Sequence, residues 1–351
     1  MSRSFVVRVP CTSSNIGPGF DVLGLSLSLY LQLIVTVDEA AGHKDPVLSY
    51  TGQGAQDAPL NPYQNLITRV ALYVLRVNNI KMFPKGVSIQ VENDIPFGRG
   101  LGSSGAAVVA GLLLGNELGR FGISHERLLD YALMIERHPD NVTAALLGGF
   151  VGSYLLELTG DDAATAQIPL SEVLPEYPEN ASEEWGRNPP TPPRNIGHYI
   201  RFGWAPEIKV IAIVPHFEVA TAEARRVLPE NYTKHDVVFN LQRLAVLTTA
   251  LTRSPPDVNL IFQAMQDKMH QPYRKHLIPG LPHILASVSP STHPGLLGIC
   301  LSGAGPTILA LAVDNLRHIA DTICAEFSSE GIACDVKFLE VIQEGAVTLQ
   351  K

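Results

Sequence analysis

Residues 96–107 read Pro-Phe-Gly-Arg-Gly-Leu-Gly-Ser-Ser-Gly-Ala-Ala, and this segment restricts the fold more than any other in the chain. Its glycines at alternate positions allow a backbone that turns its N–H groups inward, because no Cβ obstructs the turn. An apolar run that predicts a helix over residues 103–118 follows at once, with Gly119 after its end. The first N–H groups of a helix lack partners within it and carry the positive end of its dipole. The segment therefore predicts a phosphate site at a helix N-terminus.

Other interpretations of this glycine segment differ in what they require nearby. Residues 100–105 match G-x-G-x-x-G, but a dinucleotide site has that motif directly after a strand and an acidic residue about 20 positions on, ending a second strand. Here residues 95–99 intervene, and Glu117 lies inside the predicted helix. The chain has no Gly-Lys dipeptide of a Walker A loop and no His-Arg-Asp or Asp-Phe-Gly of protein kinases. A loop whose glycines only let a helix approach a strand remains an alternative, because glycine motifs alone are weak evidence.

Composition limits the class of protein. The chain has 351 residues, of which 46% are hydrophobic, and this length favours about two domains with separate cores. Because the net charge is -8 and no run of Lys or Arg occurs, we expect no nucleic-acid partner and no anionic membrane surface. The four cysteines form no Cys-x-x-Cys pair and have no metal-finger spacing, which is typical of a reduced, cytoplasmic protein.

Neither the first residues of the chain nor its longest uncharged stretch has the pattern of a membrane-inserted segment. The first ten residues include Arg3 and Arg8, where a signal peptide needs an apolar core. Residues 276–313 form the longest stretch without Asp, Glu, Lys or Arg, but prolines interrupt it. We therefore predict no membrane span.

Strand and helix patterns are mixed without regular alternation, which favours an α+β fold over a doubly wound sheet. Ser124 and Thr233 are predicted to cap helices, and a further helix begins near Asn315. Small residues in the first turns of the helix at 103–118 predict a closely packed neighbour. Strands are predicted over 5–9, 30–37, 86–92, 148–158, 208–214, 296–302, 307–313 and 335–341, with a Ser/Gly/Pro loop between the first two.

Prolines gather in one part of the chain. Six of them lie between residues 171 and 195, with acidic and polar residues among them. Such a segment predicts a linker or surface excursion and marks the best candidate for a domain boundary. The predicted organisation is a domain over 1–170, a Pro-rich linker or insertion over 171–204, and a second domain over 205–351.

A tight Gly-Pro-Gly turn lies between two polar residues near the N-terminus. Asn15 and Asp21 flank residues 17–19, so both side chains can face one small ligand. In an ordinary loop, the same two residues would instead accept hydrogen bonds from turn amides.

A carboxylate continues the apolar stripe of the helix that Ser124 caps. Glu136 lies seven residues after Leu129 and falls on the same face as Ala132. A carboxylate on a buried face is costly unless it is paired or binds a cation, and Mg²⁺ on ATP phosphates is such a cation. The alternatives are exposure to solvent or pairing with Arg137 or Arg99.

Residues that follow Glu136 and two distal arginines complete the candidate groups. Pro139 starts a new helix and leaves His138 and Asn141 around its first turn, where His138 is equally a capping or surface residue. In an acidic chain, Arg225 and Arg274 can hold a carboxylate through forked hydrogen bonds. Solvated surface arginine is the default alternative.

Together these motifs resemble the GHMP kinases, the family of galacto-, homoserine, mevalonate and phosphomevalonate kinases. Residues 96–107 resemble the family's phosphate loop, with Gly105 in place of the usual alanine, and residues 301–307 resemble its C-terminal glycine motif. The resemblance implies a two-domain fold, with a ribosomal protein S5 domain 2-like N-terminal domain that binds ATP and a ferredoxin-like C-terminal domain. It also implies ATP and Mg²⁺ as cofactors, with Ser104 and Glu136 as metal ligands and catalytic residues. The residues expected to contact ATP are Asn65, Pro96, Gly98, Arg99, Gly100, Leu101, Gly102, Ser103, Ser104, Gly105 and Gly303.

Within that family the chain is most similar to the homoserine kinase branch of fungal type. The similarity is carried by residues 10–21, 138–142, 148–150, 221–229 and 271–274. It implies phosphoryl transfer from ATP to L-homoserine for threonine synthesis, in a cytoplasmic homodimer. Asp21 would be a general base or would only orient the hydroxyl. The substrate-binding residues implied are Asn15, Asp21, His138, Asn141, Arg225 and Arg274, of which the two arginines hold the carboxylate. The alternatives are a kinase for mevalonate or a sugar, and a non-catalytic, ligand-sensing relative.

Overall fold

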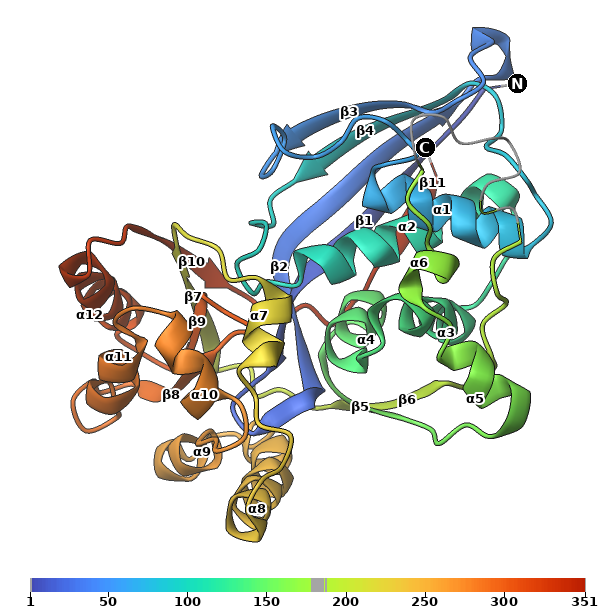
Figure 1. Ribbon diagram of the computed structural model, residues 1–351. Helices are drawn as coiled ribbons and strands as arrows, with labels where there is room; N and C mark the ends of the chain where they lie inside the picture. Colours follow the sequence, from blue (N-terminus) through green and yellow to red (C-terminus); the bar gives the residue numbers. More distant parts are fainter. Residues whose placement is uncertain (1, 178–185, 187, 351) are drawn as a thin grey trace.

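The computed structural model describes residues 2–177, 186 and 188–350, and this part of the chain contains two β-sheets with helices packed beside them (Figure 1). The first sheet has seven strands in the order β11-β1-β2-β4-β3, with β5 beside β2 and β6 beside β5. Only β3 and β4 pair in parallel. Its strands are β1 (Arg3–Asn15), β2 (Gly19–Val37), β3 (Val47–Gly52), β4 (Val87–Asn93), β5 (Phe150–Leu155), β6 (Gly197–Phe202) and β11 (Val347–Gln350).

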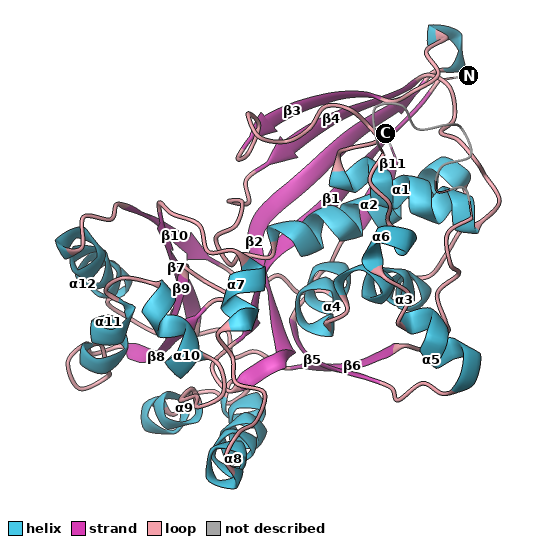
Figure 2. Cartoon of the chain, viewed as in Figure 1, coloured by secondary structure: helices cyan, strands magenta, loops and turns pink. Residues whose placement is uncertain are grey.

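Helices pack beside the first sheet (Figure 2). Helix α2 lies on β1 and along α1, as the small residues in its first turns predict, and a Cβ on Gly111 would lie 2.4 Å from the carbonyl oxygen of Ile67. Helix α4 packs on β1, β2 and β5, which places its first turn beside the phosphate segment. The helices here are η1 (Glu39–Ala41), α1 (Leu66–Val77), α2 (Ser103–Gly119), α3 (His125–Glu136), α4 (Pro139–Leu147), α5 (Gly160–Ala166) and α6 (Leu170–Val173).

The second sheet is antiparallel, with the strand order β10-β7-β9-β8. In chain order it is a βαββαβ unit, the ferredoxin-like arrangement expected for the second domain. Its strands are β7 (Lys209–Pro215), β8 (Leu296–Leu301), β9 (Ile308–Ala312) and β10 (Cys334–Leu339). Its helices are α7 (Thr221–Arg226), α8 (Lys234–Ala250), α9 (Val258–Ala264), α10 (Gln271–Arg274), η2 (Lys275–Leu277), α11 (Leu281–Ser287) and α12 (Leu316–Ser329).

The α+β class is confirmed, but the predicted N-terminal loop is wrong. Strand β1 continues to Asn15 and β2 begins at Gly19, so the loop shrinks to the turn between them. Polar residues obscured this pairing, because Thr12, Ser13 and Ser14 are buried in the strand. The long β1–β2 hairpin carries Asn15 and Asp21 to the junction with the second sheet (Figure 1).

Strand pairing also corrects details of the predicted domain limits. Residues 197–202 of the Pro-rich segment form β6 and pair with β5, and residues 347–350 form β11 and pair with β1. Both segments satisfy the backbone N–H and C=O groups of strands that would otherwise be edges, so they belong to the first sheet. Residues 178–185 and 187 of the predicted linker lie outside the described part.

The predicted caps of α3 and α8 are confirmed, since Ser124 and Thr233 accept hydrogen bonds from the N–H groups of Arg127 and Asp236. Helix α2 ends one residue later than predicted, because Arg120 rather than Gly119 takes the left-handed conformation. One apolar core extends from the first sheet to the face of the second sheet that carries Val210, Ala212 and Leu309. A separate core lies on the other face of the second sheet, where Ile211, Ile213 and Ile308 pack. All four cysteines are free thiols. Within the described residues, no helix is long and apolar enough to cross a membrane.

Candidate active site

The predicted phosphate segment forms a loop that leads into α2 from the centre of the molecule. Gly98, Gly100 and Gly102 have φ angles of +61°, +80° and +66°, which side chains with a Cβ rarely adopt. Ser103 begins α2 directly after them, so the free N–H groups of the first turn point into the loop. This is the backbone geometry of an anion site at a helix N-terminus.

Both sheets hold the loop in place. The N–H of Thr12 on β1 donates to the carbonyl of Leu101 over 3.2 Å, and the hydroxyl of Ser302 beyond β8 donates to that of Gly100 over 2.6 Å. A Cβ on Gly100 would lie 2.3 Å from the carbonyl oxygen of Ser302, and one on Gly102 would lie 2.0 Å from Thr12 Oγ1. The glycines therefore allow close packing as well as the inward turn.

Two cavities meet at the start of α2. One of about 330 Å³ extends from Ser103 and Ser104 towards Asn65 and two aromatic rings, those of Tyr50 and Phe97. The other, of about 350 Å³, is lined by the phosphate loop, the ends of α3 and α4, Thr221 of α7 and residues 303–305. Because both cavities include Gly98, Ser103 and Ser104, they flank one phosphate loop and suit the two ends of an extended ligand.

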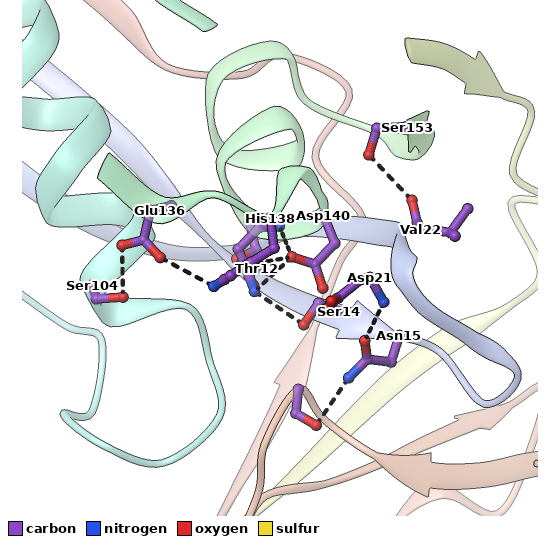
Figure 3. Close-up of polar contacts among 12 residues, drawn as sticks. Thr12, Ser14, Asn15, Asp21, Val22, Ser104, Glu136, His138, Asp140 and Ser153 are labelled. Atoms are coloured by element: carbon purple, nitrogen blue, oxygen red, sulfur yellow. Dashed lines mark hydrogen bonds and ion pairs between the residues drawn. The ribbon is translucent and has the colours of Figure 1, made fainter. Parts of the chain in front are cut away.

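Glu136, the last residue of α3, faces the second cavity. Its Oε1 accepts a hydrogen bond of 3.1 Å from the hydroxyl of Ser104, and its Oε2 lies 3.6 Å from Nε2 of His138 (Figure 3). The predicted alternatives are wrong, since Arg137 donates to the carbonyl of Ile168 and Arg99 to that of Pro215. Burial raises the pKa of Glu136, while His138 and the Ser104 hydroxyl lower it. A hydroxyl and a carboxylate oxygen side by side fit Mg²⁺, which prefers oxygen ligands.

His138 bridges Glu136 and a second carboxylate. Its Nδ1 lies 3.1 Å from Oδ1 of Asp140, which is 2% exposed. Burial of the ring lowers the pKa of His138, but the hydrogen bond to Asp140 and the charges of Asp140 and Glu136 outweigh that effect and raise it overall. The predicted surface alternative for His138 is therefore wrong, since its side chain is only 21% exposed.

Asn141 connects α4 to β1. Its Oδ1 accepts a 2.7 Å hydrogen bond from the hydroxyl of Thr12, and its Nδ2 donates to Ser14 Oγ over 3.0 Å. Gly105 packs against it, since a Cβ there would lie 3.3 Å from Asn141 Cβ. The side chain that lines the cavity is thus fixed on three sides.

Asn15 and Asp21 lie next to each other, as the Gly-Pro-Gly turn predicts. Oδ1 of Asn15 accepts from the N–H of Asp21 over 3.1 Å, and its Nδ2 donates to the carbonyl of Gly303 over 3.0 Å (Figure 3). Asn15 therefore does satisfy a turn amide, and it also joins the hairpin to the second glycine motif.

The two arginines differ in accessibility. Arg225 on α7 makes a forked ion pair with both oxygens of Asp21, at 2.8 and 3.1 Å. Arg274 on α10 is 2% exposed and donates to the carbonyls of Ala224 and Gly303, both at 3.0 Å. Both guanidinium groups lie near the ring of Phe20, at 5.6 and 5.1 Å. Burial, aided by Arg225, lowers the pKa of Arg274 to about 10.

Not every predicted ligand-contacting side chain reaches the cavities. The guanidinium of Arg99 is directed to Pro215, and Pro96 and Leu101 are buried in the loop's packing. Asn65 lines the first cavity but also caps α1, where its Oδ1 accepts from the N–H of Ile67 over 3.0 Å. A ligand could therefore contact these four residues only through their backbone or apolar atoms.

Several site residues were not predicted from the sequence. Thr12 and Ser14 lie in a segment that was predicted to be a loop. Thr221 lies in a segment that was considered only for Arg225, and Asp140 lies between His138 and Asn141, which were already assigned. The alternation of Glu136, His138 and Asp140 was the one available signal for Asp140. Ligating atoms of Asp21, His138 and Asp140 lie within 4.8 Å of one another, but the guanidinium of Arg225 already engages Asp21 and disfavours a cation there.

Comparison with known proteins agrees with this geometry. A family model for the N-terminal domain of GHMP kinases matches residues 65–149, which include the phosphate loop and the first turn of α4. The homoserine kinase of Saccharomyces cerevisiae is 56% identical over 100% of both chains. That of Candida albicans is 52% identical over 98% of this chain and 97% of its own. The crystal structure of homoserine kinase from Cytophaga hutchinsonii aligns with a TM-score of 0.75 at 25% identity, over 99% of this chain and 97% of that one.

Proposed function

Because the chain belongs to the homoserine kinases, a branch of the GHMP kinase family, we propose that it transfers the γ-phosphoryl group of ATP to the side-chain hydroxyl of L-homoserine. The product is O-phospho-L-homoserine, an intermediate for threonine synthesis. One observation carries the proposal: the phosphate loop shares a cavity of about 350 Å³ with Glu136, His138 and Asn141. A phosphate donor and a small polar acceptor therefore fit side by side.

ATP spans the two cavities in this proposal. The adenine lies in the cavity beside Asn65, whose wall includes the rings of Tyr50 and Phe97, and the phosphates accept from the N–H groups of the loop and of α2. Ser104 and Glu136 hold Mg²⁺, which, when bound, neutralises charge on the transferred phosphoryl group. The chain's own contribution is mainly positioning and electrostatic stabilisation.

Homoserine lies on the far side of the same cavity. We place its amino-alcohol end against His138 and Asn141, which line the cavity, and against Asn15 and Asp21, which adjoin it through the hydrogen bond of Asn15 to Gly303. Arg225 with Arg274 supplies positive charge for its carboxylate. Arg225 shares its guanidinium between that carboxylate and Asp21. Arg274 contributes through its positive charge, since its guanidinium is buried and donates to backbone carbonyls.

Asp21 orients the acceptor hydroxyl rather than acting as a general base. Both oxygens of its carboxylate accept from Arg225, which fixes the direction of the carboxylate and suits an orienting role. The hydroxyl proton then passes to a phosphoryl oxygen.

An ADP-release assay with three acceptors tests the reaction. Purified chain with ATP and Mg²⁺ is offered homoserine, mevalonate and galactose in parallel. We expect turnover with homoserine, because two arginines suit an amino-acid carboxylate better than galactose and because the fungal relatives of 47% to 56% identity are homoserine kinases. Preferred turnover of mevalonate or galactose would identify a sibling kinase, and no turnover with any acceptor would favour a ligand-sensing relative.

A homodimer in the cytoplasm accompanies this function in the proposal. Apolar side chains are unusually exposed on α8 and on the β5–β6 pair, where Leu241, Ile200 and Tyr154 are 60%, 60% and 59% exposed. Exposed apolar side chains on a helix and on an edge pair of strands favour association. Sedimentation equilibrium of the wild-type chain against a Leu241→Glu variant tests it, with a monomer in both cases contradicting the dimer.

A further inference from the structure

One buried carboxylate beside the cavity has no assigned role. Asp140 is the second residue of α4 and is 2% exposed. Strand β2 covers it closely, since a Cβ on Gly24 would lie 2.1 Å from the carbonyl oxygen of Asp140. A carboxylate removed from water is costly unless its hydrogen bonds and charge are matched, so its partners show what it does.

The first partner is the ring of His138. Since a carboxylate only accepts, the 3.1 Å contact requires the proton on Nδ1 of the histidine. The ring is then held with Nε2 towards Glu136, 3.6 Å away, at the wall of the cavity. Asp140 thereby sets both the direction of the imidazole and the nitrogen that carries its proton (Figure 3).

The second partner is Asn141. The same Oδ1 of Asp140 accepts from the backbone N–H of Asn141 over 2.8 Å and from its Nδ2 over 3.3 Å. This fixes the amide with Nδ2 towards Asp140 and Ser14, and leaves Oδ1 to accept from the hydroxyl of Thr12. One oxygen atom therefore orients both side chains at the start of α4, His138 just before the helix and Asn141 in its first turn, that line the cavity.

We propose that Asp140 is a positioning residue for the acceptor side of the site: it holds His138 and Asn141 in the orientations that bind the phosphoryl acceptor. The proposal rests on the proposed function for the identity of that acceptor. It does not involve the phosphate loop, to which Asp140 makes no hydrogen bond among the described residues.

A purely structural role is the competing explanation, because an aspartate in the first turn of a helix stabilises it by accepting from backbone N–H groups. Asp140→Ser separates the two. Serine is well suited to a helix N-terminus, but its side chain is too short to reach His138 and Asn141 together. Asp140→Asn keeps an acceptor oxygen at the same distance and serves as the rescuing variant.

Asp130 provides a matched control. It too is a buried aspartate, 4% exposed, and accepts from the backbone N–H groups of Asn195 and Ile196 and from Arg127. It lies on α3, outside both cavities. Asp130→Ser should lower the melting temperature without changing either KM.

Steady-state kinetics of the full chain with ATP, Mg²⁺ and homoserine give the first readout. For Asp140→Ser we expect the homoserine KM to rise by about tenfold or more, with the ATP KM within about twofold of wild type. Asp140→Asn should recover most of the homoserine affinity. Equal homoserine KM values in wild type and Asp140→Ser, or equal changes in both KM values, would overturn the proposal.

The second readout does not depend on turnover. NMR of the chain labelled with ¹⁵N-histidine reports which ring nitrogen carries the proton, and the missing signal in His138→Gln assigns the residue. We expect a protonated Nδ1 in wild type and Asp140→Asn, and loss of that signature in Asp140→Ser. An unchanged signature would contradict the proposal, whereas failure of the wild-type chain to phosphorylate homoserine would overturn only the proposed function.

Discussion

The phosphate loop is built from the backbone of one continuous segment, whereas the opposite wall of the same cavity is built from side chains at the end of α3, at the start of α4 and on α7. Residues of β1 and β2 join this wall through hydrogen bonds to Asn141, Gly303 and Arg225. On the loop side, three glycines and the first turn of α2 present N–H groups, which any polyphosphate can use. On the acceptor side, each polar group is oriented by another one. Asp140 fixes His138 and Asn141, and Arg225 engages Asp21.

This difference predicts how substitutions on each side of the cavity impair binding. A backbone site tolerates changes of side chain but not the addition of a Cβ at a glycine with positive φ. A side-chain network loses function one member at a time, and its loss shows in the affinity for the acceptor. Substitutions on the two sides should therefore separate the two KM values.

The largest effect is expected where the two sides meet, at Glu136. Glu136→Gln keeps the shape of the side chain and its hydrogen bond with Ser104, but it removes the charge that we propose holds Mg²⁺. We expect kcat to fall by about a hundredfold or more and the Mg²⁺ concentration for half-maximal rate to rise. Magnesium titrations at saturating ATP and homoserine measure both quantities.

Ser104→Ala is the control for this prediction. It removes the other proposed oxygen ligand without removing charge, so its effect on the Mg²⁺ requirement should be smaller. A Glu136→Gln variant with normal magnesium dependence would exclude the carboxylate as a ligand.

The next largest effect tests the backbone side. In Gly102→Ala the new Cβ meets Thr12 Oγ1 at 2.0 Å, in a backbone conformation with φ of +66°. We expect an unfolding free energy lower by about 2 kcal/mol or more, and an ATP KM raised more than the homoserine KM. Denaturant unfolding and steady-state kinetics measure these changes.

Gly122→Ala is its matched control. Gly122 has nearly the same φ, +65°, but no atom lies within 4 Å of the added Cβ. The variant should lose only the cost of the left-handed conformation, about 1 kcal/mol, and keep both KM values. Equal kinetic damage in both variants would show that the loop is not a phosphate site.

The contrast between the two sides also explains what the sequence could predict. The loop was predictable because all its parts are local in the sequence. Alternate glycines at 98–102 lead directly into two serines and the helix predicted over 103–118. Helix caps such as Ser124 and Thr233 were predictable for the same reason. The mixed strand and helix patterns indicated the α+β class, and a resemblance to a family then supplied the two-domain fold and the roles of residues far apart in the chain.

What could not be predicted depends on packing between distant segments. Buried serines and a threonine in β1 were taken for a loop, because period-two alternation of apolar residues is lost where the other face of a strand packs on a site. The burial of Arg274 follows from contacts with Ala224 and Gly303, about 50 and 29 residues away in the chain. The role of β6 and β11 in the first sheet is equally non-local, because strand pairing has no local signature.

A moderate effect is expected at Asp21, within the acceptor network. Asp21→Asn removes the charge that pairs with Arg225 but leaves an oxygen to orient the acceptor hydroxyl. Because we assign an orienting role, we expect kcat to fall by about tenfold at most and the homoserine KM to rise, with the ATP KM unchanged. A loss of kcat by about a thousandfold or more would instead identify a general base.

The smallest expected effect is on the pH dependence of stability. The pKa of His138 is raised in the folded state because, despite burial, Asp140 and Glu136 favour its charged form. The folded chain thus binds this proton more tightly than the unfolded chain. The resulting stabilisation is fully present below about pH 6.5, the ordinary pKa of histidine, and is lost as the pH rises through the folded-state pKa.

His138→Gln should flatten this dependence. The melting temperature of the wild-type chain should fall more between about pH 6 and 8 than that of the variant, whereas substitution of the exposed His276 on η2 should leave the wild-type slope unchanged. Calorimetric scans at matched ionic strength measure the slopes. The phosphate loop contains no histidine, so this pH dependence reports on the acceptor network alone. If the melting temperature of His138→Gln fell with pH as steeply as that of wild type, or more steeply, the charge of His138 would not stabilise that network.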